Sequence, residues 1–296
     1  MSTSRAAVLP VHVRPSAYWA LTKPDVSFLV VLTTAAGYYL GSPRPLDIAR
    51  MVHAVLATAL IAAGTAALNQ YFERAADARM RRTASRPLPS GQLKPASALL
   101  FGVALCIAGA AYLALASGWL PAFLGVLTSL TYLGFYTPLK SRTTLATLVG
   151  AFPGAVPPLI GWAAARGSLS LEAWILYAIL FLWQFPHFMA IAWMYREDYA
   201  RAGILMLPVV DKSGFRTFRQ VLVTAVVLVP VSLLPAVVGL AGIPYFFGAL
   251  VLGLMQVQVC LWAARSKSNT RAKWLMHATV LYIPLLLALL MWDKLL

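Results

Sequence analysis

The stretch LEAWILYAILFLWQFPHFMAIAW, from Leu171 to Trp193, decides the class of fold. Apolar side chains fill it almost without interruption, and roughly 20 such residues are what one α-helix needs to cross the hydrocarbon core of a bilayer. Strands of membrane barrels are about ten residues long and alternate apolar with polar side chains, a pattern that this stretch lacks. We therefore expect a membrane-spanning helix here.

Comparable stretches recur along the whole chain. Of its 296 residues, 60% are hydrophobic and only 11% are charged, as in membrane proteins and unlike soluble domains. We expect an all-α polytopic membrane protein with a single domain over residues 1–296. Its nine predicted transmembrane helices are Ala17–Leu40, Val55–Tyr71, Ala96–Ala116, Trp119–Tyr136, Leu145–Ala165, Leu171–Trp193, Val221–Gly242, Ile243–Ala264 and Trp274–Trp292. The fifth contains AFPGAVPPLIGW, from Ala151 to Trp162, which predicts a kink beside a cavity.

The basic residues lie mainly on one side of these predicted helices. With the N-terminus in the cytoplasm, 20 of the 24 Lys and Arg residues fall in cytoplasmic segments, among them Arg5 and Arg14. The four exceptions are Arg44, Arg50, Arg166 and Lys294. This asymmetry follows the positive-inside rule. Contact with anionic lipids then explains the net charge of +15, and nucleic-acid binding is not indicated. The short N-terminus favours a bacterial inner membrane.

The first candidate site is at the cytoplasmic end of the second predicted helix. Asn69, Glu73 and Asp77 are four residues apart, so on a helix they share one face with roughly 6 Å between neighbours. Two acids at this spacing repel each other unless a cation joins them, and Mg²⁺ prefers carboxylates combined with substrate phosphate oxygens. The alternative is a solvated helix end that neighbouring arginines neutralise.

The second candidate site is YTPLKSR, from Tyr136 to Arg142, at the cytoplasmic end of the fourth predicted helix. Lys140 and Arg142 are suited to hold a diphosphate, the arginine as a fork and the lysine as a point charge. Equally, both residues are ordinary anchors at the membrane surface.

The third candidate site runs from inside the sixth predicted helix into the loop that follows. Gln184 and His187 are polar groups within a span, which are costly and often functional. A neutral imidazole is suited to bind iron in a porphyrin, although a histidine in a span is also found as a structural hydrogen-bonding group. Arg196, Glu197, Asp198 and Tyr199 follow and provide a second acidic pole.

The three candidate sites emerge on the same membrane face, because all three helices run from outside to inside. Together they predict a cytoplasmic mouth with acidic and basic residues above an apolar cavity. Such a site suits an amphiphile with a diphosphate head and a hydrocarbon tail. No role is assigned to Asp25, which follows Lys23 and Pro24 at the start of the first helix, or to the isolated His12, His53 and His277.

These residues resemble the UbiA prenyltransferase superfamily. The residues that carry its first motif here are Asn69, Glu73, Asp77, Met80, Arg82, Thr83, Arg86 and Gly91. Glu73 stands where aspartate is common, and adjacent Glu197 and Asp198 replace two spaced aspartates. The stretches WQFPHF and DYARAGILMLP are similar to the haem O synthase branch. The resemblance extends over all the predicted helices and implies a helical bundle around a central cavity.

The resemblance implies transfer of a farnesyl group from farnesyl diphosphate to a vinyl group of haem B, with water, giving haem O and diphosphate. It implies Mg²⁺ as the cofactor, haem B as a substrate, and a haem A synthase as a partner. The implied catalytic residues are Asn69, Glu73, Asp77, Lys140 and Asp198. The implied metal ligands are Asn69, Glu73, Asp77, Glu197 and Asp198. The implied diphosphate-binding residues are Arg82, Arg86, Lys140, Arg142 and Tyr136. The implied haem-binding residues are His187, Gln184, Arg196 and Tyr199.

Two other functions are compatible with parts of this pattern. A UbiA-type enzyme that prenylates an aromatic quinone precursor would share the diphosphate site, but WQFPHF argues against it. A transporter would also have interrupted helices and polar groups in its spans. Transporter sites lie near the middle of the membrane, however, whereas these acids gather at one face.

Overall fold

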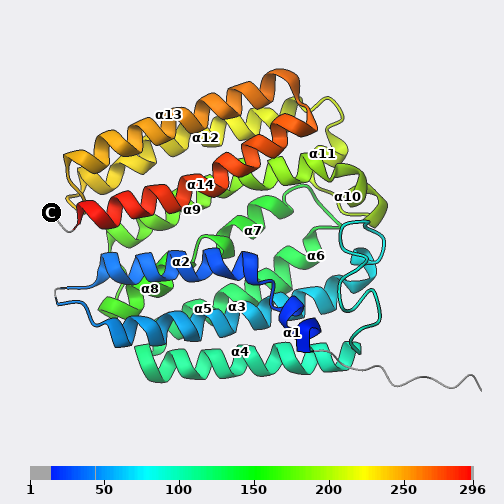
Figure 1. Ribbon diagram of the computed structural model, residues 1–296, viewed down its shortest axis with the longest axis horizontal. Coiled ribbons are helices and arrows are strands. Elements are labelled where there is room, and N and C mark those ends of the chain that lie inside the picture. Colours follow the sequence, from blue (N-terminus) through cyan, green and yellow to red (C-terminus); the bar gives the residue numbers. More distant parts are fainter. Residues whose placement is uncertain (1–14, 44, 295–296) are drawn as a thin grey trace, which may run out of the picture.

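A computed structural model describes residues 15–43 and 45–294, and within these residues it is helical without strands (Figure 1). The helices are α1 (Pro15–Leu21), α2 (Pro24–Gly41), α3 (Ile48–Asp77), α4 (Pro95–Ser117), α5 (Trp119–Thr131), the π-helix η1 (Tyr132–Tyr136), α6 (Thr137–Leu139), α7 (Ala146–Gly154), α8 (Pro157–Arg166), α9 (Leu171–Met194), α10 (Arg196–Ala202), α11 (Leu207–Val210), α12 (Phe215–Val237), α13 (Ile243–Ser266) and α14 (Asn269–Asp293). The predicted placements of Arg5, Arg14 and Arg44 concern positions outside the described residues.

The predicted all-α membrane fold is confirmed. Within the described residues, eight helical stretches are long and apolar enough to cross a membrane, with α5, η1 and α6 forming one of them and α7 and α8 another. The first predicted helix corresponds to α2, whose Asp25, threonines and tyrosines make it less apolar than the other eight. This helix is shorter than predicted because the chain turns at Lys23, where φ is 46°, and Pro24 then starts a new helix.

Glycine allows the closest packing in the bundle, between α2 and α8. A Cβ atom on Gly161 would overlap the carbonyl oxygen of Thr34, and one on Gly37 would overlap that of Pro158. Small residues at such contacts let helix backbones approach each other in a membrane, where packing replaces the hydrophobic driving force. This contact holds α2 against the centre of the molecule.

The predicted kink in the fifth helix is confirmed. The helix breaks at Ala155 and Val156, and Pro157 starts α8. The side chain of Gln184 on α9 compensates for the interruption, since its Nε2 donates to the carbonyl oxygen of Ala151 at 2.8 Å. A broken helix is tolerated inside a membrane protein when a neighbouring helix satisfies the freed backbone groups in this way.

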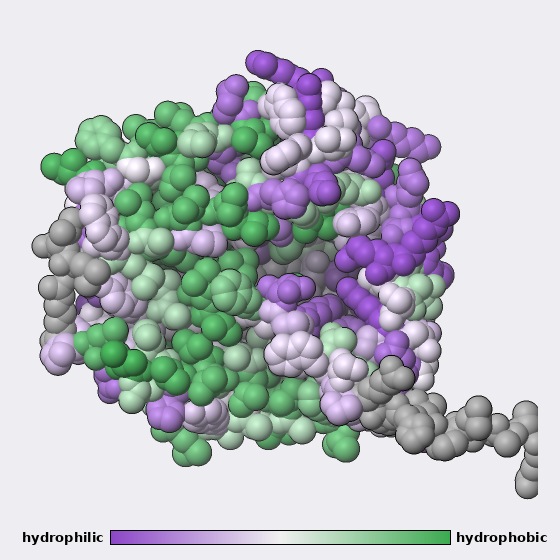
Figure 2. Space-filling model, in the orientation of Figure 1, coloured by the Kyte–Doolittle hydropathy of each residue, from purple (hydrophilic) through white to green (hydrophobic). Residues whose placement is uncertain are grey.

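Hydrophilic side chains gather mainly at one end of the bundle, where α1, α10 and α11 lie (Figures 1 and 2). We call this the polar end. It consists of Lys23, residues 78–94, the C-terminal end of α6, and α10 and α11. We call the opposite end, formed by residues 42–43 and 45–47, the turn at 238–242 and the C-terminal end of α14, the far end. The surface between the two ends is largely apolar in Figure 2, as expected for contact with lipid.

Candidate active site

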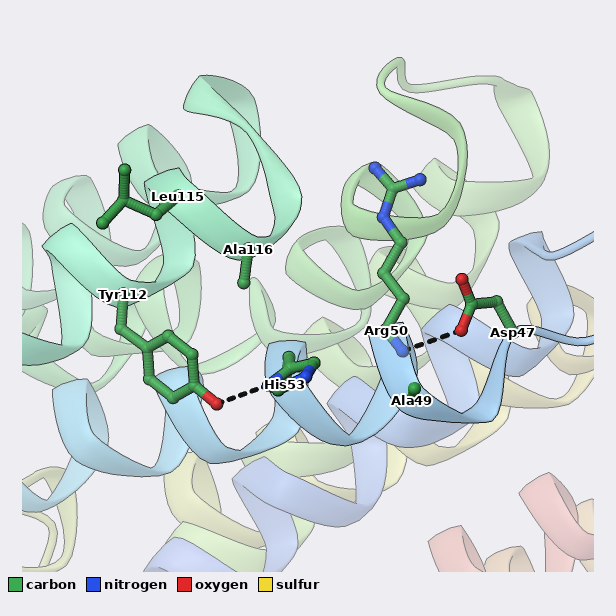
Figure 3. A pocket seen from close by; sticks show the side chains of 7 residues that line it. All are labelled: Asp47, Ala49, Arg50, His53, Tyr112, Leu115 and Ala116. Atoms are coloured by element: carbon green, nitrogen blue, oxygen red, sulfur yellow. Dashed lines mark hydrogen bonds between the residues drawn. The ribbon is translucent and has the colours of Figure 1, made fainter.

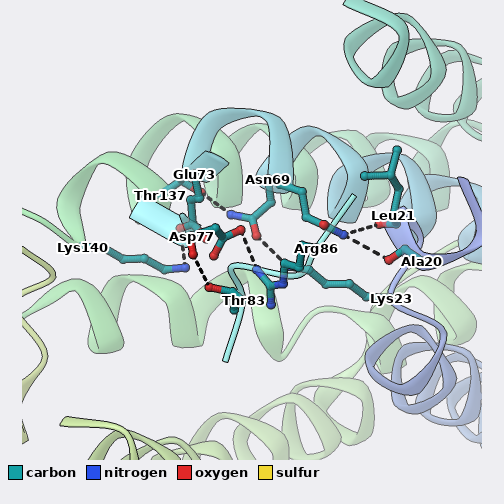
Figure 4. A network of polar contacts seen from close by, with 11 residues as sticks. Ala20, Leu21, Lys23, Asn69, Glu73, Asp77, Thr83, Arg86, Thr137 and Lys140 are labelled. Atoms are coloured by element: carbon teal, nitrogen blue, oxygen red, sulfur yellow. Dashed lines mark hydrogen bonds and ion pairs between the residues drawn. The ribbon is translucent and has the colours of Figure 1, made fainter. Parts of the chain in front are cut away.

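The C-terminal end of α3 places Asn69, Glu73 and Asp77 on one face, as their spacing predicts (Figure 4). Asn69 and Asp77 are each only 1% exposed, and the Glu73 side chain is 13% exposed. These three side chains are therefore not a solvated helix end. Buried carboxylates need partners, because an unpaired buried charge is costly.

Each of the three side chains is paired with a basic side chain from another part of the chain. Lys140 Nζ lies 2.6 Å from Glu73 Oε1, and Arg86 Nη1 lies 2.7 Å from Asp77 Oδ2. Lys23 Nζ donates to Asn69 Oδ1 at 2.8 Å. We call these six residues the acid–base cluster (Figure 4). It brings together the start of α2, the end of α3, the loop after α3 and the end of α6.

Residues 78–94 position the arginines that the sequence pattern singled out. Thr83 Oγ1 donates to the carbonyl oxygen of Asp77 at 2.9 Å, which turns the chain back along α3 and brings Arg86 to its partner. Arg82 differs from Arg86. Its guanidinium lies 4.9 Å from the centroid of the Tyr195 ring, and its backbone N–H donates to Asp198 Oδ2 at 3.3 Å.

Lys140 is held by the aromatic and acidic groups around it. Its Nζ lies 4.4 Å from the centroid of the Tyr136 ring. Burial by itself would lower the pKa of Lys140, but Tyr136 and Glu73 raise that pKa well above its ordinary value. The ammonium group is therefore charged at neutral pH. Arg142 is exposed and takes no part in the hydrogen bonds and ion pairs of the acid–base cluster.

Lys23 is the member of this cluster to which the sequence reading assigned no role. Burial and the nearby Arg86 lower the pKa of the Lys23 amine to about 7. An anion placed between these cations would favour the charged amine. The signal in the sequence is a lysine followed by proline inside an apolar stretch, a pair that ends one helix and starts another.

The second acidic pole is divided in the structure. Asp198 is 8% exposed, accepts the hydrogen bond from the Arg82 backbone and forms an ion pair with Arg201. Glu197 is exposed. Tyr199 packs among apolar side chains that include Met80. Asp198 is therefore the acid of this pole that is hydrogen-bonded to the loop following α3.

The residues expected to bind haem are spread over α9 and α10. His187 faces α14, where its Nδ1 lies 2.9 Å from Thr279 Oγ1. Gln184 faces α7, as described above. Arg196 donates to the carbonyl oxygen of Trp193 and to Asn269 Oδ1, so its guanidinium is held at the start of α14.

Asn69, Glu73 and Asp77 are a suitable donor set for a divalent cation. Asp77 Oδ1 is buried and has no hydrogen-bond partner among the described residues, so it is available for an additional cation. Over residues 15–43 and 45–294, no three His, Cys, Asp or Glu side chains are grouped closely enough to hold a metal by themselves. A Mg²⁺ ion bound by two carboxylates and an amide oxygen would need further oxygens from its substrate, which is how Mg²⁺ sites are often completed.

A separate pocket of about 410 Å³ lies at the far end of the bundle (Figure 3). His53 Nδ1 and Tyr112 Oη are 2.6 Å apart there, and Asp47 accepts a hydrogen bond from the backbone N–H of Arg50. Among the described residues that line this pocket, Arg50 is the one lysine or arginine. This pocket therefore lacks the pairs of acidic and basic side chains that form the acid–base cluster.

Comparison with known proteins gives consistent results over most of the chain. Residues 30–291 match the model of the UbiA prenyltransferase family. The protoheme IX farnesyltransferase of Solibacter usitatus (strain Ellin6076) is 49% identical and covers 94% of this chain and 98% of that relative. The protoheme IX farnesyltransferase of Koribacter versatilis (strain Ellin345) is 45% identical over 94% of this chain and 93% of that relative.

Solved structures are similar in fold at much lower sequence identity. A digeranylgeranylglyceryl phosphate synthase structure is 18% identical with a TM-score of 0.78, covering 94% of this chain and 98% of that one. A UbiA homologue from Archaeoglobus fulgidus bound to GPP and Mg²⁺ is 15% identical with a TM-score of 0.63, covering 93% of this chain and 99% of that one.

Proposed function

The chain belongs to the UbiA prenyltransferase family and converts haem B to haem O, and we propose that the acid–base cluster is where it binds and ionises farnesyl diphosphate. The farnesyl group goes to a vinyl carbon of haem B, water supplies a hydroxyl group, and diphosphate is released. The observation that carries the site assignment is the burial of Asn69, Glu73 and Asp77 opposite three basic side chains from separate segments.

Asn69, Glu73 and Asp77 are the residues that would hold Mg²⁺. When bound, the metal would neutralise negative charge on the diphosphate and so make it a better leaving group. The unpartnered Asp77 Oδ1 supports this assignment. So does the Archaeoglobus fulgidus homologue, which was solved with GPP and Mg²⁺. Asp198 and Glu197 are proposed only as a secondary pole, in which Asp198 is the residue bonded to the loop of the acid–base cluster.

Lys23, Arg86 and Lys140 would donate hydrogen bonds to the diphosphate as it leaves. Charge-assisted hydrogen bonds to phosphate oxygens are strong, and donors fixed in place before the reaction stabilise the charge that develops in the transition state. Arg82, Arg142 and Tyr136 would surround these three residues. Tyr136 would act by fixing Lys140, whose ammonium group lies over its ring.

The reaction requires no nucleophilic side chain. The carbon–oxygen bond of farnesyl diphosphate breaks, and its electron pair leaves with the diphosphate. The π electrons of the haem vinyl group form the new carbon–carbon bond. Water adds to the resulting cation and loses a proton. The apolar interior would keep water from the allylic cation before the vinyl group reaches it.

His187 would bind the haem from α9. Of the four residues implied by the family resemblance, it is the one that is a natural ligand for haem iron. The Gln184 amide is hydrogen-bonded to the broken fifth helix, and the Arg196 guanidinium is hydrogen-bonded to Asn269 on α14. Both residues would therefore stabilise the walls of the haem site without contacting the iron. Tyr199 would line the wall near Met80.

The protein is an integral membrane protein, and we place the polar end in the cytoplasm of a bacterium, at its inner membrane. The uneven distribution of Lys and Arg supports this orientation. Anionic lipid headgroups would then contact the basic loops. A haem A synthase would be the partner that receives haem O, as the family resemblance implies.

Mass spectrometry of the porphyrin tests this function. Purified protein in detergent is incubated with haem B, farnesyl diphosphate and Mg²⁺. We expect a mass gain equal to one farnesyl group plus one hydroxyl group, and EDTA should abolish it. Unchanged haem, with prenylation of a hydroxybenzoate offered in parallel, would contradict the assignment of haem as the acceptor.

A further inference from the structure

His187 lies in a fixed position between two helices. Its ring stacks on Trp183, with ring centroids 5.2 Å apart and an angle of 15° between the planes. Its Nδ1 lies 2.9 Å from Thr279 Oγ1 on α14. Trp183 Nε1 also donates to the carbonyl oxygen of Thr279 at 2.7 Å, so two side chains of α9 are bonded to the same residue of α14. Rotation of the ring would break these contacts.

The hydrogen bonds of Thr279 decide which nitrogen of His187 carries the proton. A threonine hydroxyl has one hydrogen to donate. Thr279 Oγ1 lies 2.6 Å from the carbonyl oxygen of Met276, which is itself only an acceptor, so the hydroxyl hydrogen lies between these two oxygens. The Thr279 oxygen must then accept a hydrogen bond from His187 Nδ1–H.

The reverse arrangement is unfavourable. If the Thr279 hydroxyl donated to His187 Nδ1, its oxygen would face the Met276 carbonyl oxygen at 2.6 Å with no hydrogen between them. Thr279 is fully buried, so no water is at hand to separate the two oxygens. The buried surroundings therefore select the neutral imidazole protonated on Nδ1.

This tautomer leaves the other nitrogen, Nε2, as an acceptor. Among the described residues Nε2 makes no hydrogen bond with the protein, although His187 is partly accessible while Gln184, Phe185, Pro186 and Met189 around it are buried. Nε2 is thus left without a partner from the described part of the protein. A bare imidazole nitrogen whose partner nitrogen donates a hydrogen bond is the form in which histidine binds metals.

We propose that Thr279 is a positioning residue that holds His187 in the Nδ1–H tautomer, so that Nε2 is presented as an axial ligand to the iron of the substrate haem. This proposal rests on the proposed function, because it assumes that haem binds on the His187 side. Thr279 itself does not touch the haem. It fixes the orientation of the ligand and keeps its lone pair available.

The test compares Thr279→Val, which keeps the shape but removes the hydroxyl, with Thr279→Ser, which keeps the hydroxyl. Haem B is titrated into each purified variant and followed by its absorption spectrum. Loss of a residue that orients a metal ligand typically weakens metal binding by about 10- to 100-fold, and we expect a loss in that range for Thr279→Val. Thr279→Ser should bind haem as the wild type does.

Resonance Raman spectroscopy of the ferrous haem complex gives a readout that general damage to the fold would not mimic. The iron–histidine stretching frequency depends on the hydrogen bond at Nδ1, so it should shift in Thr279→Val and return in Thr279→Ser. The Michaelis constant for farnesyl diphosphate should stay unchanged in both variants, which also shows that they are folded.

His187→Ala separates failure of this inference from failure of the proposed function. We expect this variant to lose the histidine-ligated spectrum and to regain it when imidazole is added. If His187→Ala loses the spectrum while Thr279→Val keeps both the wild-type affinity and the wild-type frequency, the role of Thr279 is wrong and the haem site stands. If His187→Ala binds haem unchanged, the haem site is wrong, and the role of Thr279 with it.

Discussion

The two ends of the bundle use charged side chains in different ways. At the far end, Asp293 accepts hydrogen bonds from the backbone N–H groups of Gly242 and Tyr245. Lys294 donates to the carbonyl oxygens of Tyr39, Leu40 and Ser42. At the polar end, the acids of the acid–base cluster are paired with basic side chains instead, and no group in the described part of the chain donates a hydrogen bond to Asp77 Oδ1.

This difference separates structural charges from functional ones. A side chain that satisfies backbone groups at a helix end cannot leave them without exposing unsatisfied donors or acceptors. A lysine or arginine that pairs with a carboxylate can move to a phosphate oxygen when a metal takes the carboxylate. We therefore expect substitutions in the acid–base cluster to change activity, and substitutions of acids that satisfy backbone N–H groups, such as Asp293, to change stability.

Asp77→Asn should give the largest effect. The amide keeps the shape but removes the charge that would bind the metal and hold Arg86. We expect kcat/KM for haem O formation to fall about 100-fold or more, as when one preorganised group for transition-state charge is lost. The thermal unfolding midpoint should change little, because Arg86 is partly exposed and can turn to solvent. Wild-type turnover in Asp77→Asn would contradict the functional role assigned to the acids of the acid–base cluster.

Asp293→Ala should give the opposite result. It leaves two backbone N–H groups at the start of α13 without an acceptor, which costs about 1–3 kcal/mol in the free energy of unfolding. Activity measured well below the unfolding temperature should stay near that of the wild type. An inactive but fully stable Asp293→Ala protein would show that the far end takes part in catalysis.

Lys23→Met should raise the Michaelis constant for farnesyl diphosphate by about 10-fold, because one hydrogen bond from a charged group is worth roughly 1.5 kcal/mol or more. The matched control is Lys94→Met, which removes the same charge from an exposed position at the start of α4. Steady-state kinetics at saturating haem B provides the measurement. Equal Michaelis constants in the two variants would show that Lys23 does not bind the diphosphate.

Asp211→Asn should give the smallest effect and sharpens the comparison, because Asp211 lies at the polar end but uses its oxygens structurally. Oδ2 accepts from the backbone N–H and the hydroxyl of Thr217, and Oδ1 accepts from Ser213. We expect a loss of about 1 kcal/mol in the free energy of unfolding, typical of a lost helix cap, with normal activity.

The stability difference caused by Asp211→Asn should also depend on pH. Burial would raise the pKa of Asp211, but the hydrogen bonds from Thr217 and Ser213 outweigh burial and lower it below its ordinary value of 3.8. The stabilisation by the carboxylate is therefore complete above that value and is lost as the pH falls through the lower pKa of the folded state. Unfolding curves at neutral and acidic pH measure this change. A constant difference would contradict it.

The sequence predicted the parts of this protein that depend on short-range pattern. Apolar length predicted the helices, and the four-residue spacing predicted that Asn69, Glu73 and Asp77 share a face. The basic partners were harder to predict. Lys23 and Asn69 are 46 positions apart, and Glu73 and Lys140 are 67 apart, so tertiary packing decides these pairs.

The haem side shows the same limit. The polar residues within α9 were visible in the sequence, but their partners were not. Gln184 satisfies a backbone carbonyl freed by the broken fifth helix, and His187 meets Thr279, 92 positions away. A polar residue inside a span therefore indicates that a partner is needed, while the structure identifies that partner.

The most direct test of the central claim locates the metal. Crystals of the protein grown with Mn²⁺ and a non-hydrolysable thio analogue of farnesyl diphosphate would give an anomalous difference map of the ion. We predict an Mn²⁺ peak bonded to Asp77 Oδ1, with Arg86 moved from the carboxylate to the diphosphate. An ion bound elsewhere, with the Arg86–Asp77 pair intact beside the bound diphosphate, would contradict this account.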